Sequence, residues 1–201
     1  MKRIKINLKK VAKDEIDLII NYFKRGKAIV YPTDTVYGLG CLATDVKAIK
    51  KIYAIKKRDK DKPLLILVKD IKMMRAYCFL SKEQENFIKK ARLGEKPVSF
   101  VLKKRSKLPK ELSGGQDSIA VRFPDLLKNH FLTKILEGAG SPIVSTSFNV
   151  SGRKILNRPS RLENYFTKEK PDLVIDVGTM KAKPSRLIDI RDLGDIKTLR
   201  K

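Results

Sequence analysis

An apolar segment that stops abruptly at a polar, glycine-containing run is the feature of this sequence that most limits its possible folds. Residues 28–31 have the composition of a short buried strand, and Pro32 then withholds a backbone N–H, so we expect regular pairing to end there. The following run, residues 33–40, contains two threonine hydroxyls, a carboxylate and a phenol, and then two glycines that let the backbone approach a ligand closely. This is the composition of a binding site. A turn whose Thr and Asp side chains bond only the nearby backbone would have the same composition.

Helical and strand patterns alternate along the rest of the chain. Cap residues and a proline predict where helices begin, namely at Asp14, at Asp45, at the capping box of Ser81 and Gln84, and at Pro124, with a shorter helix at residues 160–166. Apolar or alternating runs predict strands at residues 2–8, 28–31, 64–68, 98–102, 118–122, 142–146, 173–177, 186–190 and 196–199. The late strands follow one another without long crossovers, so we predict an α/β fold with a mixed parallel and antiparallel sheet. The polar residues 103–117 are expected to form a mobile loop.

The charge of the chain is unusual. Its 201 residues include 46 Lys and Arg against 22 Asp and Glu, a formal net charge of +24, and self-repulsion on that scale needs a reason. A polyanionic partner, either RNA or a triphosphate substrate, is one reason, and a heat-adapted, lysine-rich surface is another. We favour the polyanion, because heat-adapted surfaces usually balance Lys with Glu.

Composition also limits the location and the cofactors that we expect. No apolar run approaches the ~18 residues of a membrane span, and no signal region is seen, so we expect a cytoplasmic protein that does not contact the membrane. The two cysteines, Cys41 and Cys78, are far apart and share the chain with a single histidine, His130. A structural zinc site or a disulfide framework is therefore not expected.

The common catalytic and nucleotide-binding motifs do not apply here. Residues 38–43 match the dinucleotide-binding pattern Gly-x-Gly-x-x-Gly/Ala, but that pattern places its glycines directly between a strand and a helix. In this chain polar residues precede the glycines, and the helix cap Asp45 follows the motif. A P-loop lysine motif, a nucleophile elbow and a histidine-based triad are also missing from the sequence. Any chemistry must therefore proceed without a side-chain nucleophile of the usual kind.

Two further clusters are candidates for binding. Lys56 falls on the apolar stripe of the second predicted helix, where a charged amine is unexpected, and Arg58 follows it into a loop, so the two cations could grip a phosphate chain from two sides. A solvated, mixed-charge loop is the simpler interpretation. The run Ser147-Phe148-Asn149 follows a predicted strand, where such sheets tend to place ligands, although a polar turn would look the same.

In chain order, the motifs are Pro32 to Gly40, Lys56-x-Arg58 with Lys62-Pro63-Leu64, Ile119 to Pro124, and Ser147-x-Asn149 with Ser151-Gly152. Their order and spacing resemble the signature series of the YrdC-type threonylcarbamoyl-AMP synthases, over nearly the whole chain. The resemblance implies a twisted mixed α/β sheet with a basic concave face. It also implies one domain, residues 1–201, without the additional C-terminal domain of longer family members.

The family resemblance implies an enzyme, a nucleotidyltransferase that joins L-threonine, bicarbonate and ATP into L-threonylcarbamoyladenylate and pyrophosphate. That adenylate feeds tRNA threonylcarbamoyladenosine modification, so tRNA and the threonylcarbamoyl transferase machinery are implied partners. We expect Mg²⁺ to arrive with ATP, because no carboxylate cluster marks a protein-built metal site. We also expect a monomer.

The same resemblance assigns roles by position. Lys56 and Arg58 are the candidate catalytic residues. The positions that hold threonine are Thr35, Arg122, Ser147 and Ser185. The positions that hold ATP are Lys56, Arg58, Lys62, Ser118, Asn149, Asn157 and Arg200. Phe148 departs from the family, in which a small residue is common in the middle of the Ser-x-Asn motif.

A non-catalytic domain that binds double-stranded RNA or tRNA through the same basic face is the alternative function. The net charge serves both functions. Only the polar residues beside the cations distinguish them, since a protein that binds the nucleic-acid backbone needs basic residues but not a small polar pocket.

Overall fold

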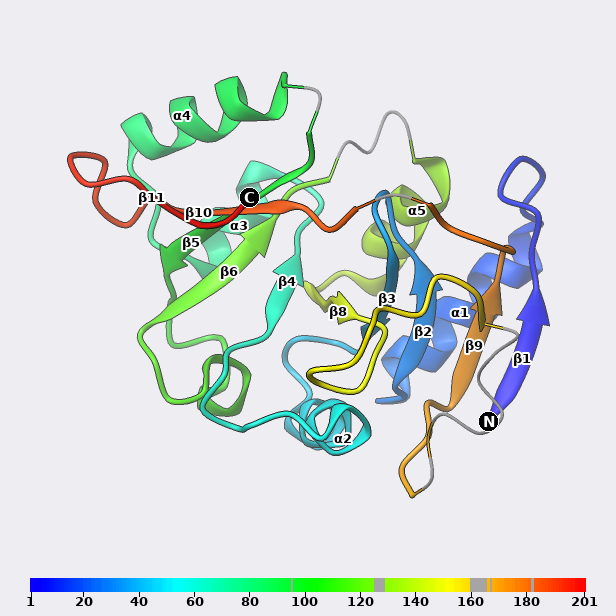
Figure 1. Ribbon diagram of the computed structural model, residues 1–201. Coiled ribbons are helices and arrows are strands. Elements are labelled where there is room, and N and C mark those ends of the chain that lie inside the picture. Colours follow the sequence, from blue (N-terminus) through cyan, green and yellow to red (C-terminus); the bar gives the residue numbers. More distant parts are fainter. Residues whose placement is uncertain (95, 125–128, 160–165, 167, 182) are drawn as a thin grey trace.

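The computed structural model describes residues 1–201 except 95, 125–128, 160–165, 167 and 182 (Figure 1). Its strands form two sheets. The order in the first sheet is β1 (Lys2–Lys5), β9 (Leu173–Asp176), β2 (Ile29–Pro32), β3 (Tyr37–Gly40) and β8 (Thr146–Ser147). The order in the second sheet is β11 (Lys197–Arg200), β10 (Arg186–Asp189), β5 (Val98–Lys103), β6 (Ser118–Arg122), β4 (Leu65–Leu67) and β7 (Ile143–Val144).

Both sheets mix parallel and antiparallel pairs, as the sequence predicts. In the first sheet β9 pairs in parallel with β1 and β2, whereas β3 is antiparallel to β2 and β8. In the second sheet β10 and β5 are parallel, as are β4 and β6, and the remaining pairs are antiparallel. The α/β class with a mixed sheet is therefore confirmed, although the strands divide into two sheets.

The two sheets meet where β7 and β8 follow each other in the chain. Ser145 separates these strands, and its N–H donates to the carbonyl of Leu65. The predicted strand at residues 142–146 is therefore wrong in one respect, since the chain changes sheets in its middle. At this junction Gly40 is needed, because a Cβ there would lie 2.0 Å from the carbonyl oxygen of Val144.

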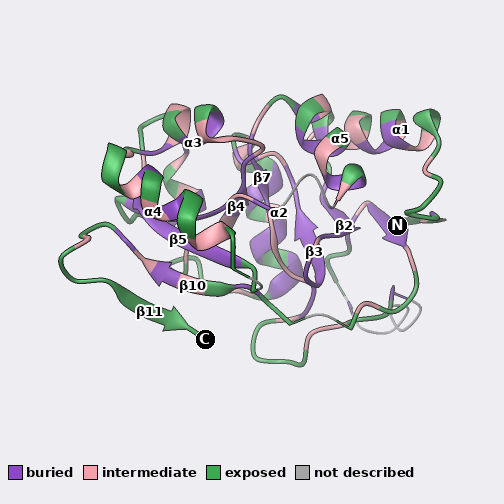
Figure 2. Cartoon of the chain, turned by 90° about the horizontal axis from the view of Figure 1, so that it is seen from above, coloured by how far each residue is buried: buried purple, intermediate pink, exposed green. Residues whose placement is uncertain are grey.

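Helices pack on both faces of the first sheet. Alternate residues of β2 point in opposite directions, so Ile29 and Tyr31 pack in a core with α1 (Lys13–Lys24) and α5 (His130–Ala139). Val30 packs in the other core with α2 (Val46–Lys56). Figure 2 shows α1 and α5 side by side above the strands. No helix within the described ranges is long and apolar enough to cross a membrane.

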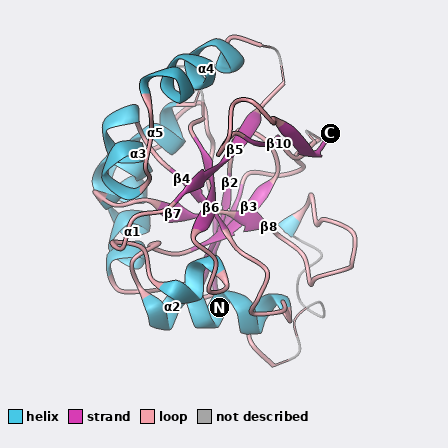
Figure 3. Cartoon of the chain, turned by 90° about the vertical axis from the view of Figure 1, so that its left-hand side faces the viewer, coloured by secondary structure: helices cyan, strands magenta, loops and turns pink. Residues whose placement is uncertain are grey.

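The second sheet carries α3 (Ile71–Tyr77) and α4 (Lys82–Arg92), and residues of both helices pack into the core that contains α2. In Figure 3 the helices α1, α3, α4 and α5 lie on one side of the strands, whereas β8 and β10 lie toward the other side. A short 3-10 helix, η1 (Lys110–Ser113), lies between β5 and β6. Its Leu112 is buried, so part of the segment that we expected to be a loop is packed against the core.

Several local predictions are confirmed and others are wrong. Asp45 caps α2 by accepting from the N–H of Ala48, and the capping box of Ser81 and Gln84 opens α4. The cap that we predicted at Asp14 lies two residues earlier, at Ala12, whose N–H donates to the Glu15 carboxylate. Regular pairing of β2 ends at Pro32, as predicted.

Pro32 is paired with Tyr37, and the glycine-containing run continues as β3. The missing N–H is tolerated there because Pro32 is the last residue of its strand. In the described chain α5 begins at His130, capped by the Asn129 side chain, rather than at Pro124. The predicted short helix at residues 160–166 lies almost entirely outside the described residues.

Candidate active site

The polar run found in the sequence forms the turn between β2 and β3. Thr33 Oγ1 lies 2.7 Å from the carbonyl oxygen of Val36, to which it donates, and 2.9 Å from Thr35 Oγ1. Because a hydroxyl has one hydrogen, Thr35 must be the donor between the two threonines. The lone pairs of Thr35 Oγ1 then accept from Arg122 Nη1 at 2.9 Å. Thr33 therefore stabilises the turn, whereas Thr35 connects the turn to a cation from the other sheet.

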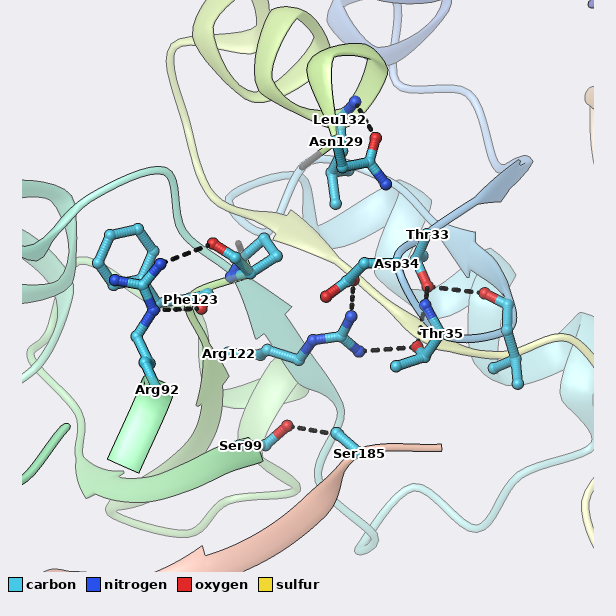
Figure 4. A network of polar contacts seen from close by, with 12 residues as sticks. Thr33, Asp34, Thr35, Arg92, Ser99, Arg122, Phe123, Asn129, Leu132 and Ser185 are labelled. Atoms are coloured by element: carbon cyan, nitrogen blue, oxygen red, sulfur yellow. Dashed lines mark hydrogen bonds and ion pairs between the residues drawn. The ribbon is translucent and has the colours of Figure 1, made fainter. Parts of the chain in front are cut away.

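Arg122 is the buried cation of the site. It is the last residue of β6 and only 5% exposed, and its Nη2 forms an ion pair with Asp34 (Figure 4). Burial and then the nearby charge of Arg200 lower the pKa of Arg122 to about 10, against the opposing effect of Tyr31. Within the described part of the chain, its Nε has no hydrogen-bond partner. A buried N–H without a partner is costly, so this atom is a natural donor to a bound ligand.

A cavity of about 330 Å³, which we call the central cavity, lies beside Arg122. It is lined by six of the residues assigned from the sequence, Thr35, Arg58, Arg122, Ser147, Ser185 and Arg200. Residues from both sheets and from two loops thus converge on one space.

Ser185 and Arg200 form the wall of the central cavity that comes from the end of the chain. Arg200 Nε donates to the carbonyl oxygen of Ser185 at 2.8 Å, and its Nη2 lies 3.3 Å from Ser185 Oγ. The hydroxyl of Ser185 also bonds that of Ser99, at 2.7 Å. Ser185, which we expect to bind threonine, is therefore in direct contact with Arg200, which we expect to bind ATP.

A second cavity, of about 340 Å³, lies on the other side of Arg58 and Ser147, which line both cavities. We call it the loop cavity. Its lining includes Lys56, Lys62 and Asn149. The shared residues place the two cavities next to each other, with arginine side chains along the central cavity and both lysine and arginine side chains along the loop cavity.

Lys56 is buried at the end of α2, with 1% of its surface exposed. Its Nζ donates to the carbonyl oxygens of Ser147, at 2.5 Å, and Asn149, at 2.8 Å, and to Asn149 Oδ1 at 3.0 Å. An ammonium has three N–H donors, so these bonds use all of them. Burial, and secondarily the charge of Arg58, lower the pKa of Lys56 to about 7. Lys56 therefore holds the Ser-x-Asn turn in shape.

Arg58 is held by its own loop. Its Nε donates to the carbonyl oxygen of Lys62 at 3.2 Å, and its Nη2 donates to that of Pro63 at 2.9 Å. Burial lowers the pKa of its guanidinium. Carbonyl contacts fix the direction of Arg58 without neutralising its charge, which leaves the charge available to an anion.

Two assigned residues lie apart from the others. Ser118, at the start of β6, is buried, and Asn157 is exposed. Neither belongs to the lining of the central cavity or the loop cavity, so their contacts with ATP stay a prediction. Sequence reasoning gave no role to Asp34, which pairs with Arg122, or to Ser99, which bonds Ser185. A serine inside the apolar run of β5 was the available signal for Ser99.

The metal-binding potential of the described residues is small. Among them, no group of three or more His, Cys, Asp or Glu side chains could hold a metal ion. Cys41 and Cys78 are both buried free thiols.

Known proteins resemble this chain over almost its whole length. The profile of the family described as telomere recombination, which groups Sua5, YciO and YrdC, matches residues 21–201. The threonylcarbamoyl-AMP synthase of Pyrococcus abyssi is 31% identical over 183 residues, which are 89% of this chain and 51% of that protein. The chain thus spans about half the length of that relative. The threonylcarbamoyl-AMP synthase of Histophilus somni strain 129Pt is 32% identical over 182 residues, 89% of this chain and 94% of that protein.

Solved structures agree with the sequence comparison. Sua5 from P. abyssi in complex with L-threonine has a TM-score of 0.80 and 27% identity, covering 94% of this chain and 53% of that one. YciO from E. coli has a TM-score of 0.86 and 25% identity, covering 100% of this chain and 96% of that one.

Proposed function

Because the chain belongs to the Sua5, YciO and YrdC family, we propose that it is a threonylcarbamoyl-AMP synthase that uses the central cavity for L-threonine and the loop cavity for part of ATP. The observation that carries the proposal is Arg122, a buried guanidinium with an unpartnered Nε, in a small cavity with Thr35 and Ser185. Such a cavity suits an amino acid with a carboxylate and a hydroxyl. The names of the relatives and the threonine complex of P. abyssi Sua5 support this assignment over a plain RNA-binding domain.

The reaction divides into two steps that the residues can serve by position and charge. The amine of threonine forms a C–N bond to carbon dioxide with loss of a proton, or to bicarbonate with loss of water, and the product is a carbamate. A carbamate oxygen then attacks the α-phosphorus of ATP, and the bond from that phosphorus to the leaving pyrophosphate breaks. Arg122 would hold the carboxylate of threonine, and Arg58, at the boundary of the two cavities, would face the phosphate charge that spreads during attack. This chemistry needs no side-chain nucleophile.

The nucleotide would extend from Arg58 into the loop cavity, beside Lys62 and Asn149. Mg²⁺ carried by the phosphates would neutralise part of their charge. Lys56 would act mainly through the turn that it holds, since its three donors are already in use. Arg200, in contact with Ser185, would lie where the two substrates meet.

The proposal extends to partners and location. The adenylate product would pass to a threonylcarbamoyl transferase acting on tRNA in the cytoplasm, and the net charge of +24 suits direct contact with that RNA. We propose a monomer of one domain, residues 1–201, as the active unit.

A pyrophosphate-release assay tests the proposal. Release should require ATP, threonine and bicarbonate together, because the nucleophile is made from two of them. Arg122→Lys should abolish most of this release, whereas Arg25→Lys, a matched change at an exposed arginine, should have no effect. Equal release with serine, or no release with any amino acid, would contradict the assignment.

A further inference from the structure

We propose that Asp34 is a positioning residue, which holds the guanidinium of Arg122 in the orientation that binds the carboxylate of threonine. The inference rests on the proposed function, in which Arg122 contacts that carboxylate. Asp34 lies in the turn between β2 and β3, beside Thr35, and the roles assigned from the family resemblance do not include it.

Arg122 and its two partners come from different sheets. The arginine extends from the end of β6, and the turn residues Asp34 and Thr35 meet two separate nitrogens of its guanidinium, Nη2 and Nη1 (Figure 4). An arginine side chain has several rotatable bonds, and one contact alone would leave the plane of its guanidinium free to turn. Two contacts on two nitrogens fix that plane, and therefore the direction of the unpartnered Nε.

The negative charge of Asp34 also compensates the buried positive charge of Arg122. The Arg122 side chain is 6% exposed, so its positive charge lies mostly out of water, and the charge of Arg200 nearby disfavours it further. Asp34 supplies the compensating negative charge, and its own side chain is 19% exposed. The carboxylate thus keeps some hydration while the arginine is buried, which is a favourable arrangement for such a pair.

The Asp34 carboxylate could instead compete with the carboxylate of threonine for Arg122. Which cavity Asp34 lines distinguishes positioning from competition. Arg122 lines both the central cavity and a separate cavity of about 560 Å³, which we call the outer cavity. Asp34 belongs to the lining of the outer cavity and not to that of the central cavity. It therefore approaches the guanidinium from the side away from the proposed threonine site, and both carboxylates can be bound at once.

The test is threonine binding by the full chain, measured by isothermal titration calorimetry, with Asp34→Asn as the variant. Asn keeps the size of the side chain and removes its charge. We expect the dissociation constant for threonine to rise on the order of tenfold or more, and the KM for threonine to rise with it while kcat at saturating threonine changes little. Binding of threoninol, which lacks the carboxylate, should not change between the wild type and Asp34→Asn.

Two controls separate positioning from general damage. Asp172→Asn removes another carboxylate in an ion pair, that with Lys51, and should leave threonine binding unchanged even if the thermal midpoint falls. In an Arg122→Met background, Asp34→Asn should weaken threonine binding no further, because the two residues act as a unit. If Asp34→Asn does not fold, Asp34→Glu, which moves the charge by one methylene, should weaken binding in the same direction.

Threonine binding by Asp34→Asn that equals or exceeds wild-type binding would overturn the inference, and tighter binding would favour competition. Independent, additive effects of the Asp34 and Arg122 changes would also overturn it. In both cases the wild-type protein still binds threonine, so the proposed function survives. A wild-type protein that binds no threonine would instead contradict the proposed function, and the inference would fall with it.

Discussion

The ammonium group of Lys56 donates to three oxygen atoms of one turn, which belong to Ser147 and Asn149. A lysine in a buried apolar stripe suggested a direct grip on phosphate, and the contacts add a second role, in which the lysine shapes the turn that lines both cavities. A lysine at this helix position can either bind phosphate or hold a turn in shape. Sequence alone could not distinguish them, because the acceptors lie about ninety residues away in the chain.

We predict that Lys56→Met lowers both activity and stability. Three acceptors would lose a donor, although the Ser147 carbonyl keeps the N–H of Asn149 and Asn149 Oδ1 keeps the Ser147 hydroxyl. The carbonyl oxygen of Asn149 would keep no donor among the described contacts, which costs roughly 1–3 kcal/mol. Turnover should fall by ~10²-fold, the size expected for the loss of preorganised polar contacts. Pyrophosphate release and urea unfolding measure the two effects. Lys47→Met, an exposed lysine on the same helix, should show neither effect, and a Lys56→Met protein with normal stability and turnover would refute the turn-holding role.

The lowered pKa of Lys56 gives a second prediction, for the pH dependence of stability. Its pKa is about 7 in the folded protein, against an ordinary value of 10.5, so between these values the unfolded chain binds a proton that the folded chain lacks. Raising the pH through this range therefore stabilises the fold, by at most about 1.4 kcal/mol per pH unit from this group. Urea unfolding of wild type and Lys56→Met at several pH values isolates the effect. A difference between the two proteins that is constant with pH would contradict it.

Strand β11 is an exposed edge strand that carries Arg200, a candidate site residue. All four of its residues are exposed, yet Arg200 bonds Ser185 and lines the central cavity. We predict that deleting residues 200–201 raises the KM for ATP several-fold without shifting the thermal midpoint, because the strand contributes little buried surface. Steady-state kinetics and a thermal scan measure both quantities. Deleting Lys201 alone should have no effect, and if both deletions behave as wild type, Arg200 is not part of the ATP site.

Elements with local signals could be predicted from the sequence, and elements defined by distant contacts could not. The helix after Asp45 and the one opened by Ser81 carry their caps next to their apolar stripes, and both form as expected. Helix α3 was missed although Asp70 caps it, because its seven residues are too few to show a period. The break at Ser145 was missed as well, since it depends on where Leu65 lies in the fold.

The site was predictable to the extent that its residues share motifs. Thr35, Arg58 and Ser147 were assigned from the sequence, and the central cavity brings them together. The pairing of Asp34 with Arg122 was not foreseen, because a carboxylate in a turn normally caps its own backbone. Only the packing of one sheet against the other brings the arginine to it.

Across the whole molecule, the net charge of +24 is far larger than the charge of the Lys and Arg side chains that line the two cavities. If the excess serves tRNA, affinity for tRNA should fall steeply with salt, because each neutralised phosphate releases counterions. We expect a loss on the order of 10³-fold between about 50 and about 200 mM salt, measurable by filter binding. A protein that binds no tRNA at low salt would show that the charge has another cause.

We propose that one site joins threonine, bicarbonate and ATP. The most direct test of this proposal is mass spectrometry of the products formed by the purified chain from ATP, threonine and ¹³C-labelled bicarbonate. We expect a threonylcarbamoyl-adenylate that carries the label, formed together with pyrophosphate and lost in Arg122→Lys. An adenylate that contains no label, or no adenylate under conditions in which threonine and ATP both bind, would contradict it.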